Sequence, residues 1–207
     1  MSRFEAHIAV EGVTDEAVIK RLLLHTGIAC GYTRGLGGKP ALIKQLSKYN
    51  EAARFSNWLV VVDLDQDAEC APEFVAKELP NAAAGMLLRL PVRAVESWLL
   101  ADREHLASYL GIAVQNVPLN PDLETDPKIT LVNLARKCRK RDMREDILPR
   151  PNSGLKTGPG YTGRMLEFVQ HRDYPWRPEI AAQHSDSLRR CIAALKNWQP
   201  VGYHKPD

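Results

Sequence analysis

Three carboxylates follow one apolar run of the chain at alternate positions. The segment Trp58-Leu-Val-Val-Val62 leads directly into Asp63, and Asp65 and Asp67 come next at every second residue. Each ionised carboxylate raises the free energy needed to ionise its neighbour, so carboxylates crowd together only where a cation offsets their charge. The sequence leaves three sources of that balance open: a metal ion, an arginine or lysine partner, or plain solvent at a loop.

The spacing of Asp63 and Asp65 favours a shared cation. In an extended segment, residues i and i+2 point to the same side, so the two carboxylates can bind one hard ion. Asp67 extends the pattern only if the chain stays extended, and we interpret it as a loop acid. Oxygen ligands without a neighbouring cysteine favour magnesium, manganese or calcium over zinc or copper.

A second acidic motif lies near the start of the chain. Glu11 ends an apolar run, where a glutamate contributes little to packing, and Gly12 permits a tight turn that leaves Glu11 at the rim of a sheet. Asp15 falls in the first turn of the helix that follows, for which Thr14 is the expected N-cap. An acid in that position also stabilises the helix dipole, so this structural role for Asp15 stays open.

The first half of the chain alternates between strand and helix patterns. We expect strands at 7–12, within 27–38, at 58–62 and at 85–91, and helices from residue 14, at 40–54 and at 72–79. This alternation predicts an α/β fold with a mostly parallel sheet and helices on both faces. Because functional groups gather at the carboxyl ends of parallel strands, Glu11 and Asp63 should be neighbours in space.

The second half is expected to be helical and irregular. Helices are predicted at 92–109, 129–146, 162–170 and 178–198, with irregular segments at 114–127 and 148–161. We therefore expect a catalytic α/β core over residues 1–110 and a basic, mainly helical C-terminal extension over 111–207 that packs on the core.

The charge distribution is more informative than the net charge of +3. Ten Lys and Arg residues but only three acids lie between Lys128 and Arg164. A basic segment beside an acidic cluster suits a protein that binds phosphates through the basic segment and acts on them at the acidic cluster. For any single residue a solvated helix face is an equal alternative. The residues that we expect to contact nucleic acid are Lys39, Arg139, Lys140 and Arg141.

Composition indicates an ordinary globular protein of 207 residues, of which 44% are hydrophobic. No apolar run approaches the roughly 20 residues of a membrane span, and the first residues do not resemble a signal peptide. The four cysteines are far apart, which suggests reduced thiols in the cytoplasm and neither a disulfide framework nor a zinc site.

The acidic motifs together resemble the TOPRIM domain, the metal-binding α/β module of topoisomerases, primases and several nucleases. The resemblance rests on Val10-Glu-Gly-Val-Thr-Asp-Glu16 and Val60-Val-Val-Asp-Leu-Asp65, and covers residues 5–102, about half of the chain. Beyond these motifs, Glu96-Ser-Trp-Leu-Leu-Ala-Asp102, Gly37-Gly-Lys39 and Ser187-Leu-Arg189 are similar to elements of a small TOPRIM-like family of prokaryotic proteins. That family is related to the overcoming-lysogenization-defect nucleases.

The resemblance implies a set of functional residues. The divalent metal, Mg²⁺ or Mn²⁺, would be bound by Glu11, Asp15, Asp63, Asp65 and Glu96. Lys156 matches the downstream lysine of two-metal nucleases by position only. With this lysine included, the catalytic residues that the resemblance implies are Glu11, Glu96 and Lys156. Two ions about 4 Å apart can activate a water and stabilise the leaving oxygen of a phosphodiester.

Two functions from different classes follow. The first is a metal-dependent nuclease that cuts DNA or RNA. The second is a non-cleaving nucleic-acid-binding or effector subunit of a complex that contains a separate ATPase, since some relatives are suspected of serving in defence against phage. A small-molecule hydrolase lacks a Ser-His or Cys-His signature and is a distant third. The sequence leaves open whether the chain forms a homo-oligomer.

Overall fold

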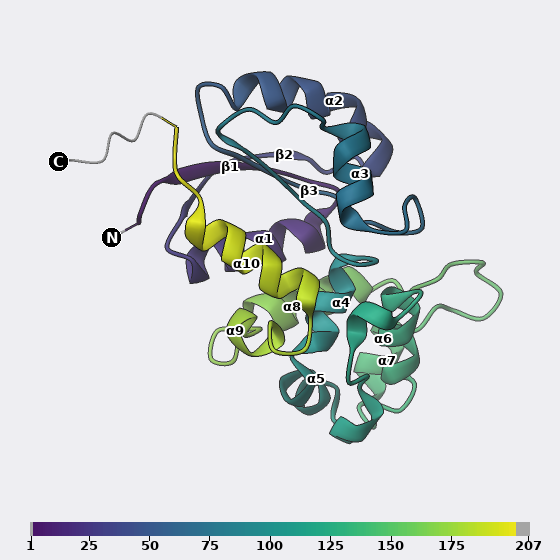
Figure 1. Cartoon of the computed structure of the whole chain (residues 1–207). Helices are drawn as coiled ribbons and strands as arrows, with labels where there is room; N and C mark the ends of the chain where they lie inside the picture. Colours follow the sequence, from purple (N-terminus) through teal and green to yellow (C-terminus); the bar gives the residue numbers. More distant parts are fainter. Residues whose placement is uncertain (1, 202–207) are drawn as a thin grey trace. The chain divides into compact units, whose positions relative to one another are not determined.

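The computed structural model describes residues 2–201, which form two compact units (Figure 1). The first unit contains the residues up to Val92 together with those from Arg190 onward, and the second runs from Arg93 to Arg189. We had expected the division at residue 110. It falls earlier because the helices after Val92 pack against elements of the second unit, as described below.

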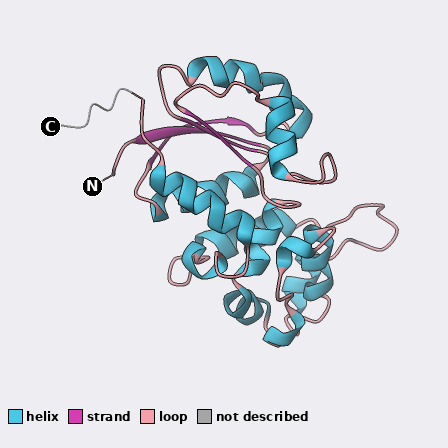
Figure 2. Cartoon of the chain, in the orientation of Figure 1, coloured by secondary structure: helices cyan, strands magenta, loops and turns pink. Residues whose placement is uncertain are grey.

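The first unit is built on a four-stranded sheet in which all strands are parallel (Figure 2). Its strands are β1 (Glu5–Val10), β2 (Ala29–Gly35), β3 (Trp58–Val61) and β4 (Met86–Arg89), in the spatial order β2-β1-β3-β4. The predicted α/β class with a parallel sheet is therefore confirmed. The chain passes from β1 to β2 on one side and then returns to β3 on the other side of β1.

Helices cover both faces of this sheet, as expected (Figure 1). They are α1 (Val13–His25), α2 (Lys39–Ala52), α3 (Ala71–Glu78) and the C-terminal part of α10 (Asp186–Asn197). Leu42 of α2 and Phe74 of α3 share one hydrophobic cluster with Val60 of β3. The alternate residue Leu59 is also fully buried and points to the opposite face, where α1 lies against β1 and β2.

The second unit is helical. It contains α4 (Val95–Ala101), α5 (Arg103–Leu110), two short 3-10 turns η1 (Val114–Asn116) and η2 (Pro121–Leu123), α6 (Pro127–Ala135), α7 (Arg141–Ile147), α8 (Tyr161–Gln170) and α9 (Pro178–Ala181). Helix α4 contacts η2, α6 and α9, which is why it belongs to this unit. Within residues 2–201, no helix is long and apolar enough to cross a membrane. All four cysteines are free thiols, as predicted.

Three predicted helices are each divided in two, and the first of them, expected at 92–109, is divided at Asp102 into α4 and α5. The expected helix 129–146 is interrupted at Cys138, whose carbonyl accepts a hydrogen bond from the Arg144 side chain at 2.7 Å. The expected helix 178–198 is interrupted before Ser185, whose hydroxyl accepts from the Leu188 backbone N–H and starts α10. In these last two places a polar side chain captures a backbone group and competes with a continuous helix.

An ion pair between the buried Asp102 and the partly exposed Arg177 joins α4 and α5 to the segment before α9. Asp102, the residue between α4 and α5, has no exposed surface, and its carboxylate accepts from the backbone N–H of Arg177 at 3.0 Å and from its Nε at 3.1 Å. Trp98 donates to Ser187 Oγ at 2.8 Å, and Trp176 donates to the carbonyl of Trp98. The motif residues Trp98, Asp102 and Ser187 are therefore structural anchors of the second unit.

We predict that Arg177→Ala destabilises the protein by about 3 kcal/mol, because it leaves the buried Asp102 carboxylate without its guanidinium. Urea unfolding followed by circular dichroism measures this change. Arg172→Ala removes an exposed arginine from the same loop and is the matched control, with an expected effect below about 0.5 kcal/mol. Equal effects of the two substitutions would contradict the role of the ion pair.

Candidate functional site at the carboxyl edge of the sheet

Glu11 and Asp63 meet where β1 and β3 end. These strands are neighbours in the sheet, and Glu11 Oε1 accepts a hydrogen bond from the backbone N–H of Asp63 at 2.8 Å. The expectation that the two residues are neighbours is confirmed. Because the chain leaves β1 and β3 toward opposite sides of the sheet, this is the switch point at which ligands bind in open parallel sheets.

Asp15 lies beside this edge in the first turn of α1. Its side chain folds back toward the turn, so that a β-carbon added to Gly12 would be 3.2 Å from Asp15 Oδ2. Only 8% of Asp15 is exposed. The prediction that Thr14 is the N-cap is wrong. Helix α1 begins at Val13, so Gly12 is the N-cap, and its carbonyl accepts from Glu16 N–H. The short Glu11-Gly12 turn brings the helix start, and Asp15 with it, close to the strand end.

The backbone turns at Asp65, contrary to the extended geometry that we had assumed for the acidic motif. Strand β3 ends at Val61, and Asp65 has φ of +50°, in the left-handed region. Aspartate tolerates this conformation better than most residues. Leu64, fully buried, donates its N–H to the carbonyl of Pro91. The acidic motif therefore forms a tight turn, and the buried side chain of Leu64 anchors this turn in the core.

The ammonium of Lys39 balances the charge of this turn. Its Nζ lies 3.0 Å from Asp65 Oδ2 and 2.6 Å from Asp67 Oδ2. It also donates to the carbonyl oxygens of Asp63 at 2.5 Å and Leu64 at 3.3 Å. Among the three sources of charge balance left open by the sequence, the structure shows a lysine partner for Asp65 and Asp67.

Burial and hydrogen bonding act in opposite directions on Lys39. Desolvation favours the neutral amine, but hydrogen bonds to Asp67 and Asp65 outweigh it, and the pKa of Lys39 lies above its usual value. Lys39 is therefore a cation over the whole physiological range. We had expected it to contact a phosphate, whereas its ammonium is here engaged by four oxygens.

The glycine-rich loop before α2 brings Lys39 to the acidic turn. Gly35 has φ of +92°, and a β-carbon at this position would lie 2.2 Å from the carbonyl oxygen of Val10. Leu36 N–H donates to the same oxygen, and Gly38 N–H donates to the carbonyl of Glu11 at 3.1 Å. The loop is thus bonded along the end of β1, and Lys39 follows as the first residue of α2.

The donor atoms at this edge suit a hard divalent cation, but the side chains are arranged around an ammonium. Glu11, Asp63 and Asp65 supply carboxylate oxygens, the ligands that magnesium and manganese prefer. Among the described residues 2–201, no group of three or more His, Cys, Asp or Glu side chains is gathered closely enough to hold a metal ion. In residue types the edge fits a metal, and the side chains of Asp65 and Asp67 are here paired with the Lys39 ammonium.

Glu96 is placed in the second unit, in the first turn of α4. It is 2% exposed, and its Oε1 accepts from the Tyr161 hydroxyl at 3.1 Å and lies 3.3 Å from Lys128 Nζ. Burial, reinforced by the Glu96 charge, raises the pKa of Tyr161 well above its usual value, so Tyr161 remains a donor. Oε2 is buried and has no hydrogen-bond partner within the described part of the chain.

Lys156 also lies in the second unit, where it pairs with Asp126. Its Nζ is 3.1 Å from Asp126 Oδ2, while Asp126 Oδ1 accepts from Ile129 N–H and caps α6. Burial opposes the ionisation of Asp126, but these two contacts offset it, and its pKa lies below the usual value. No pattern in the sequence indicated a functional role for Asp126. Its position before Pro127 is typical of a helix cap.

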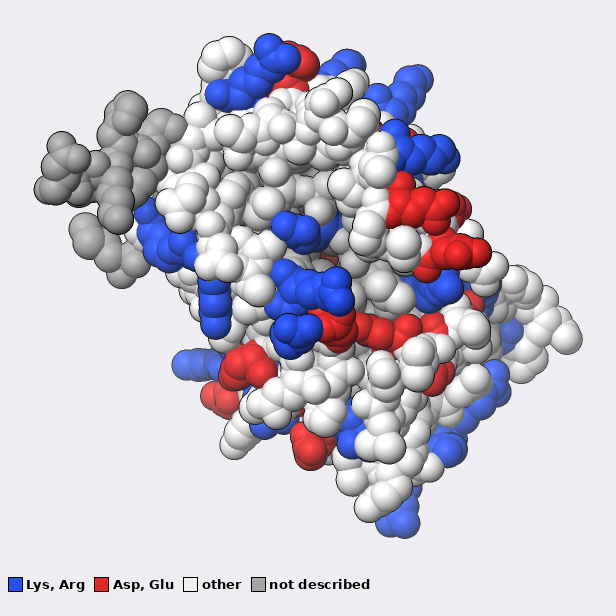
Figure 3. Space-filling view, viewed as in Figure 1, with Lys and Arg blue, Asp and Glu red and all other residues white. Residues whose placement is uncertain are grey.

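The predicted nucleic-acid contacts Arg139, Lys140 and Arg141 are exposed at the break between α6 and α7. Arg141 pairs with Glu145. On the face shown in Figure 3, Lys and Arg side chains are interspersed with Asp and Glu side chains. The positive charge of Arg141 is therefore offset by its partner.

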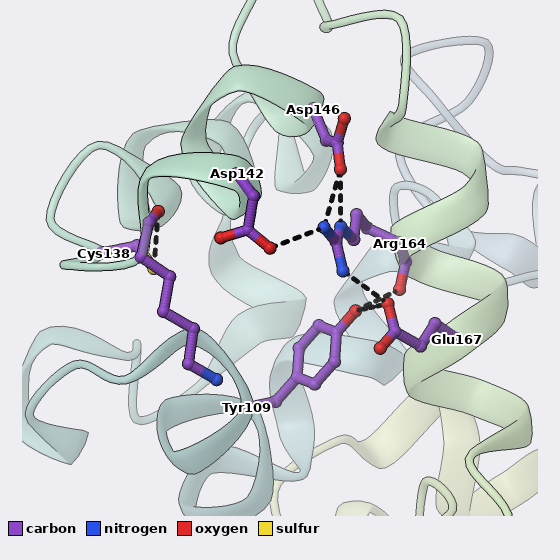
Figure 4. Close-up of polar contacts among 7 residues, drawn as sticks. Tyr109, Cys138, Asp142, Asp146, Arg164 and Glu167 are labelled. Carbon is purple, nitrogen blue, oxygen red and sulfur yellow. Dashed lines mark hydrogen bonds and ion pairs between the residues drawn. The ribbon is translucent and has the colours of Figure 1, made fainter.

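Arg164 illustrates this neutralisation (Figure 4). Its guanidinium contacts Asp142 at 3.1 Å, Asp146 at 2.8 Å and Glu167 at 2.9 Å. Glu167 also accepts from the Tyr109 hydroxyl at 3.0 Å. Arg164, Asp142, Glu167 and Tyr109 border a cavity of about 500 Å³ within the second unit. The sequence analysis counted Arg164, Asp142 and Asp146 in the basic segment but did not predict that they pair, and Glu167 lies outside that segment.

We predict that Gly35→Ala lowers stability by about 1–3 kcal/mol, because the new methyl group meets the Val10 carbonyl and the backbone conformation is strained. Gly163→Ala in α8 is the matched control, since its added β-carbon meets no atom within 4 Å. It should be neutral or stabilising. Thermal unfolding of the two variants compares them. A Gly35→Ala variant as stable as the wild type would contradict the close contact between loop and strand.

The depressed pKa of Asp126 predicts a pH-dependent contribution to stability. Asp126→Ala should cost about 1 kcal/mol at neutral pH, the usual value of a lost helix cap. Because the folded-state pKa is lowered, this contribution is present above the ordinary pKa of about 4 and disappears as the pH falls through the folded-state value. Urea unfolding over a pH series measures it, and a difference that persists at the acid end would contradict the assignment.

Comparisons of the chain with protein-family models, with curated proteins and with solved structures found no match. The fold and the geometry of the carboxyl edge are therefore the structural basis for inferring function. The resemblance to the TOPRIM domain continues to rest on the two acidic motifs themselves. The structure places both of them at one edge of a parallel sheet.

Proposed function

We propose that this protein is a divalent-metal-dependent nuclease that hydrolyses phosphodiester bonds of DNA or RNA. The observation that carries the proposal is the meeting of Glu11 and Asp63 at the switch point between β1 and β3. Two acidic residues that follow separate strands meet there, and neither belongs to the buried hydrophobic core. Carboxylates at the carboxyl ends of parallel strands are a common arrangement for binding a ligand or metal.

The residues at this edge have distinct roles in the proposal. Glu11, Asp63 and Asp65 would hold Mg²⁺ or Mn²⁺, with Asp15 as a further ligand from the start of α1. A bound ion supplies a water activated at neutral pH and charge stabilisation for the phosphodiester. The chain itself fixes the Glu11 carboxylate through the Asp63 N–H, so its orientation is set before a substrate binds.

Glu96 and Lys156, which the resemblance adds to the catalytic set, remain predictions. The buried Oε2 of Glu96, without a partner among residues 2–201, supports a role for this carboxylate as a ligand. Arg139, Lys140 and Arg141 are exposed residues that suit contact with phosphates. The four free thiols suit a reducing compartment, so we infer that the protein acts in the cytoplasm.

One observation favours the alternative function, a non-cleaving nucleic-acid-binding or effector subunit beside an ATPase in anti-phage defence. Lys39 neutralises Asp65 and Asp67, so this part of the edge is stable without a metal ion. A protein that only binds needs no metal at that position. The two functions differ in whether the purified chain cuts nucleic acid by itself.

We predict that the purified protein cuts supercoiled plasmid or structured RNA with Mg²⁺ or Mn²⁺, and that EDTA abolishes cleavage. Asp63→Asn should reduce the rate at least about 100-fold, because it removes a charged metal ligand and keeps the size of the side chain. Gel analysis of both substrates measures the rate and distinguishes DNA from RNA. Glu69→Gln, an exposed acid in the same loop, is the matched control and should retain activity. An inactive wild type would support the binding subunit instead, whereas an Asp63→Asn variant that cuts normally would contradict the assignment of the activity to this edge.

A further inference from the structure

The oxygen atoms around Lys39 Nζ form the kind of shell that surrounds a hard cation. Two are backbone carbonyl oxygens, of Asp63 and Leu64, and two are carboxylate oxygens, of Asp65 and Asp67. Carbonyl and carboxylate oxygens together are typical of protein sites for divalent ions. An ammonium group takes that place here, at distances of 2.5 to 3.3 Å.

A divalent ion and the Lys39 ammonium exclude each other at Asp65. An ion bound by this carboxylate would lie within a few ångströms of a group that is already positive, and like charges at that separation repel strongly. The ammonium lies 3.0 Å from the same Oδ2 atom of Asp65 that an ion would use. Metal binding at Asp65 therefore requires that the ammonium moves away.

The local structure permits this movement without unfolding. The backbone at the start of α2 is fixed by the bond from Gly38 N–H to the Glu11 carbonyl and by the bond from Leu42 N–H to the Gly38 carbonyl. Beyond its Cα, Lys39 has a flexible four-carbon chain whose rotamers differ widely in the position of Nζ. The ammonium lies 5.5 Å from the ring centroid of Phe74, a weak contact that rotation can break.

We propose that Lys39 is a positioning residue that acts as the resident cation of the acidic turn and competes with a divalent metal ion for Asp65. Without metal, its ammonium holds the turn from Asp63 to Asp67 in place and keeps the acids compatible with one another. When a metal ion binds, the ammonium is displaced and becomes free to contact a phosphate of the substrate. This inference rests on the proposed function, because it concerns the same metal-binding edge.

The competition predicts that removal of the ammonium strengthens metal binding. Lys39→Met should bind Mn²⁺ at least tenfold more tightly than the wild type, as measured by electron paramagnetic resonance of free Mn²⁺ or by calorimetry. Lys44→Met removes the same charge from an exposed position of α2 and should bind Mn²⁺ like the wild type. Adding Asp65→Asn to Lys39→Met should abolish the gain, which assigns it to this turn.

A second variant distinguishes a change in Mn²⁺ affinity from a loss of folding. Lys39→Gln keeps hydrogen-bond donors near Asp65 and Asp67 but carries no charge, so it should fold and should also bind Mn²⁺ more tightly than the wild type. Mn²⁺ should raise the melting temperature of Lys39→Gln more than that of the wild type, since ligand binding to the folded state stabilises it in proportion to affinity.

The outcomes separate this inference from the proposed function. Equal or weaker Mn²⁺ binding by Lys39→Met and Lys39→Gln, in a protein that still cleaves with Mn²⁺, would overturn the competition and leave the nuclease standing. Absence of Mn²⁺ binding in the wild type and in every variant, together with absence of cleavage, would overturn both. Tighter binding by both variants supports the competition whether or not the wild type cleaves.

Discussion

Charge balance at the carboxyl edge of the sheet is the constraint on which the rest of this structure depends. A parallel sheet ends all of its strands at one edge, so acids that follow β1 and β3 are forced together. Their mutual repulsion must be offset, and the Lys39 ammonium offsets it for Asp65 and Asp67. The glycine-rich loop is hydrogen-bonded to the end of β1 and places this lysine beside the acidic turn. The fold and the electrostatics of the edge are therefore inseparable.

The second unit shows that residues of one short motif serve different physical purposes. In the segment from Glu96 to Asp102, Trp98 and Asp102 are anchors, with each polar group held by a partner from another segment. Glu96 is equally buried, yet one of its carboxylate oxygens has no hydrogen-bond partner among the described residues. Burying a carboxylate oxygen without a partner costs free energy. This contrast distinguishes Glu96 from Trp98 and Asp102 as a candidate for function.

Counting charges along the sequence overstates how basic the segment from Lys128 to Arg164 is in space. Lys128 pairs with Glu96, Lys156 pairs with Asp126, and Arg164 is surrounded by three acids. Paired charges attract a distant phosphate weakly, because the fields of the two partners largely cancel. The exposed residues Arg139 and Lys140 are better candidates for contact with nucleic acid than the segment as a whole.

The sequence by itself determined the features that depend on local periodicity: the alternation of strands and helices, the parallel sheet, and the convergence of Glu11 and Asp63 at strand ends. Side-chain and backbone contacts that periodicity does not reveal decided the rest. Helices broke where Arg144 or Ser185 captured a backbone group, and the turn at Asp65 replaced the extended segment. The sequence showed that the clustered acids need a cation. Only the tertiary structure showed that Lys39, 26 residues before Asp65, supplies it, because that pairing depends on how α2 is placed over the sheet.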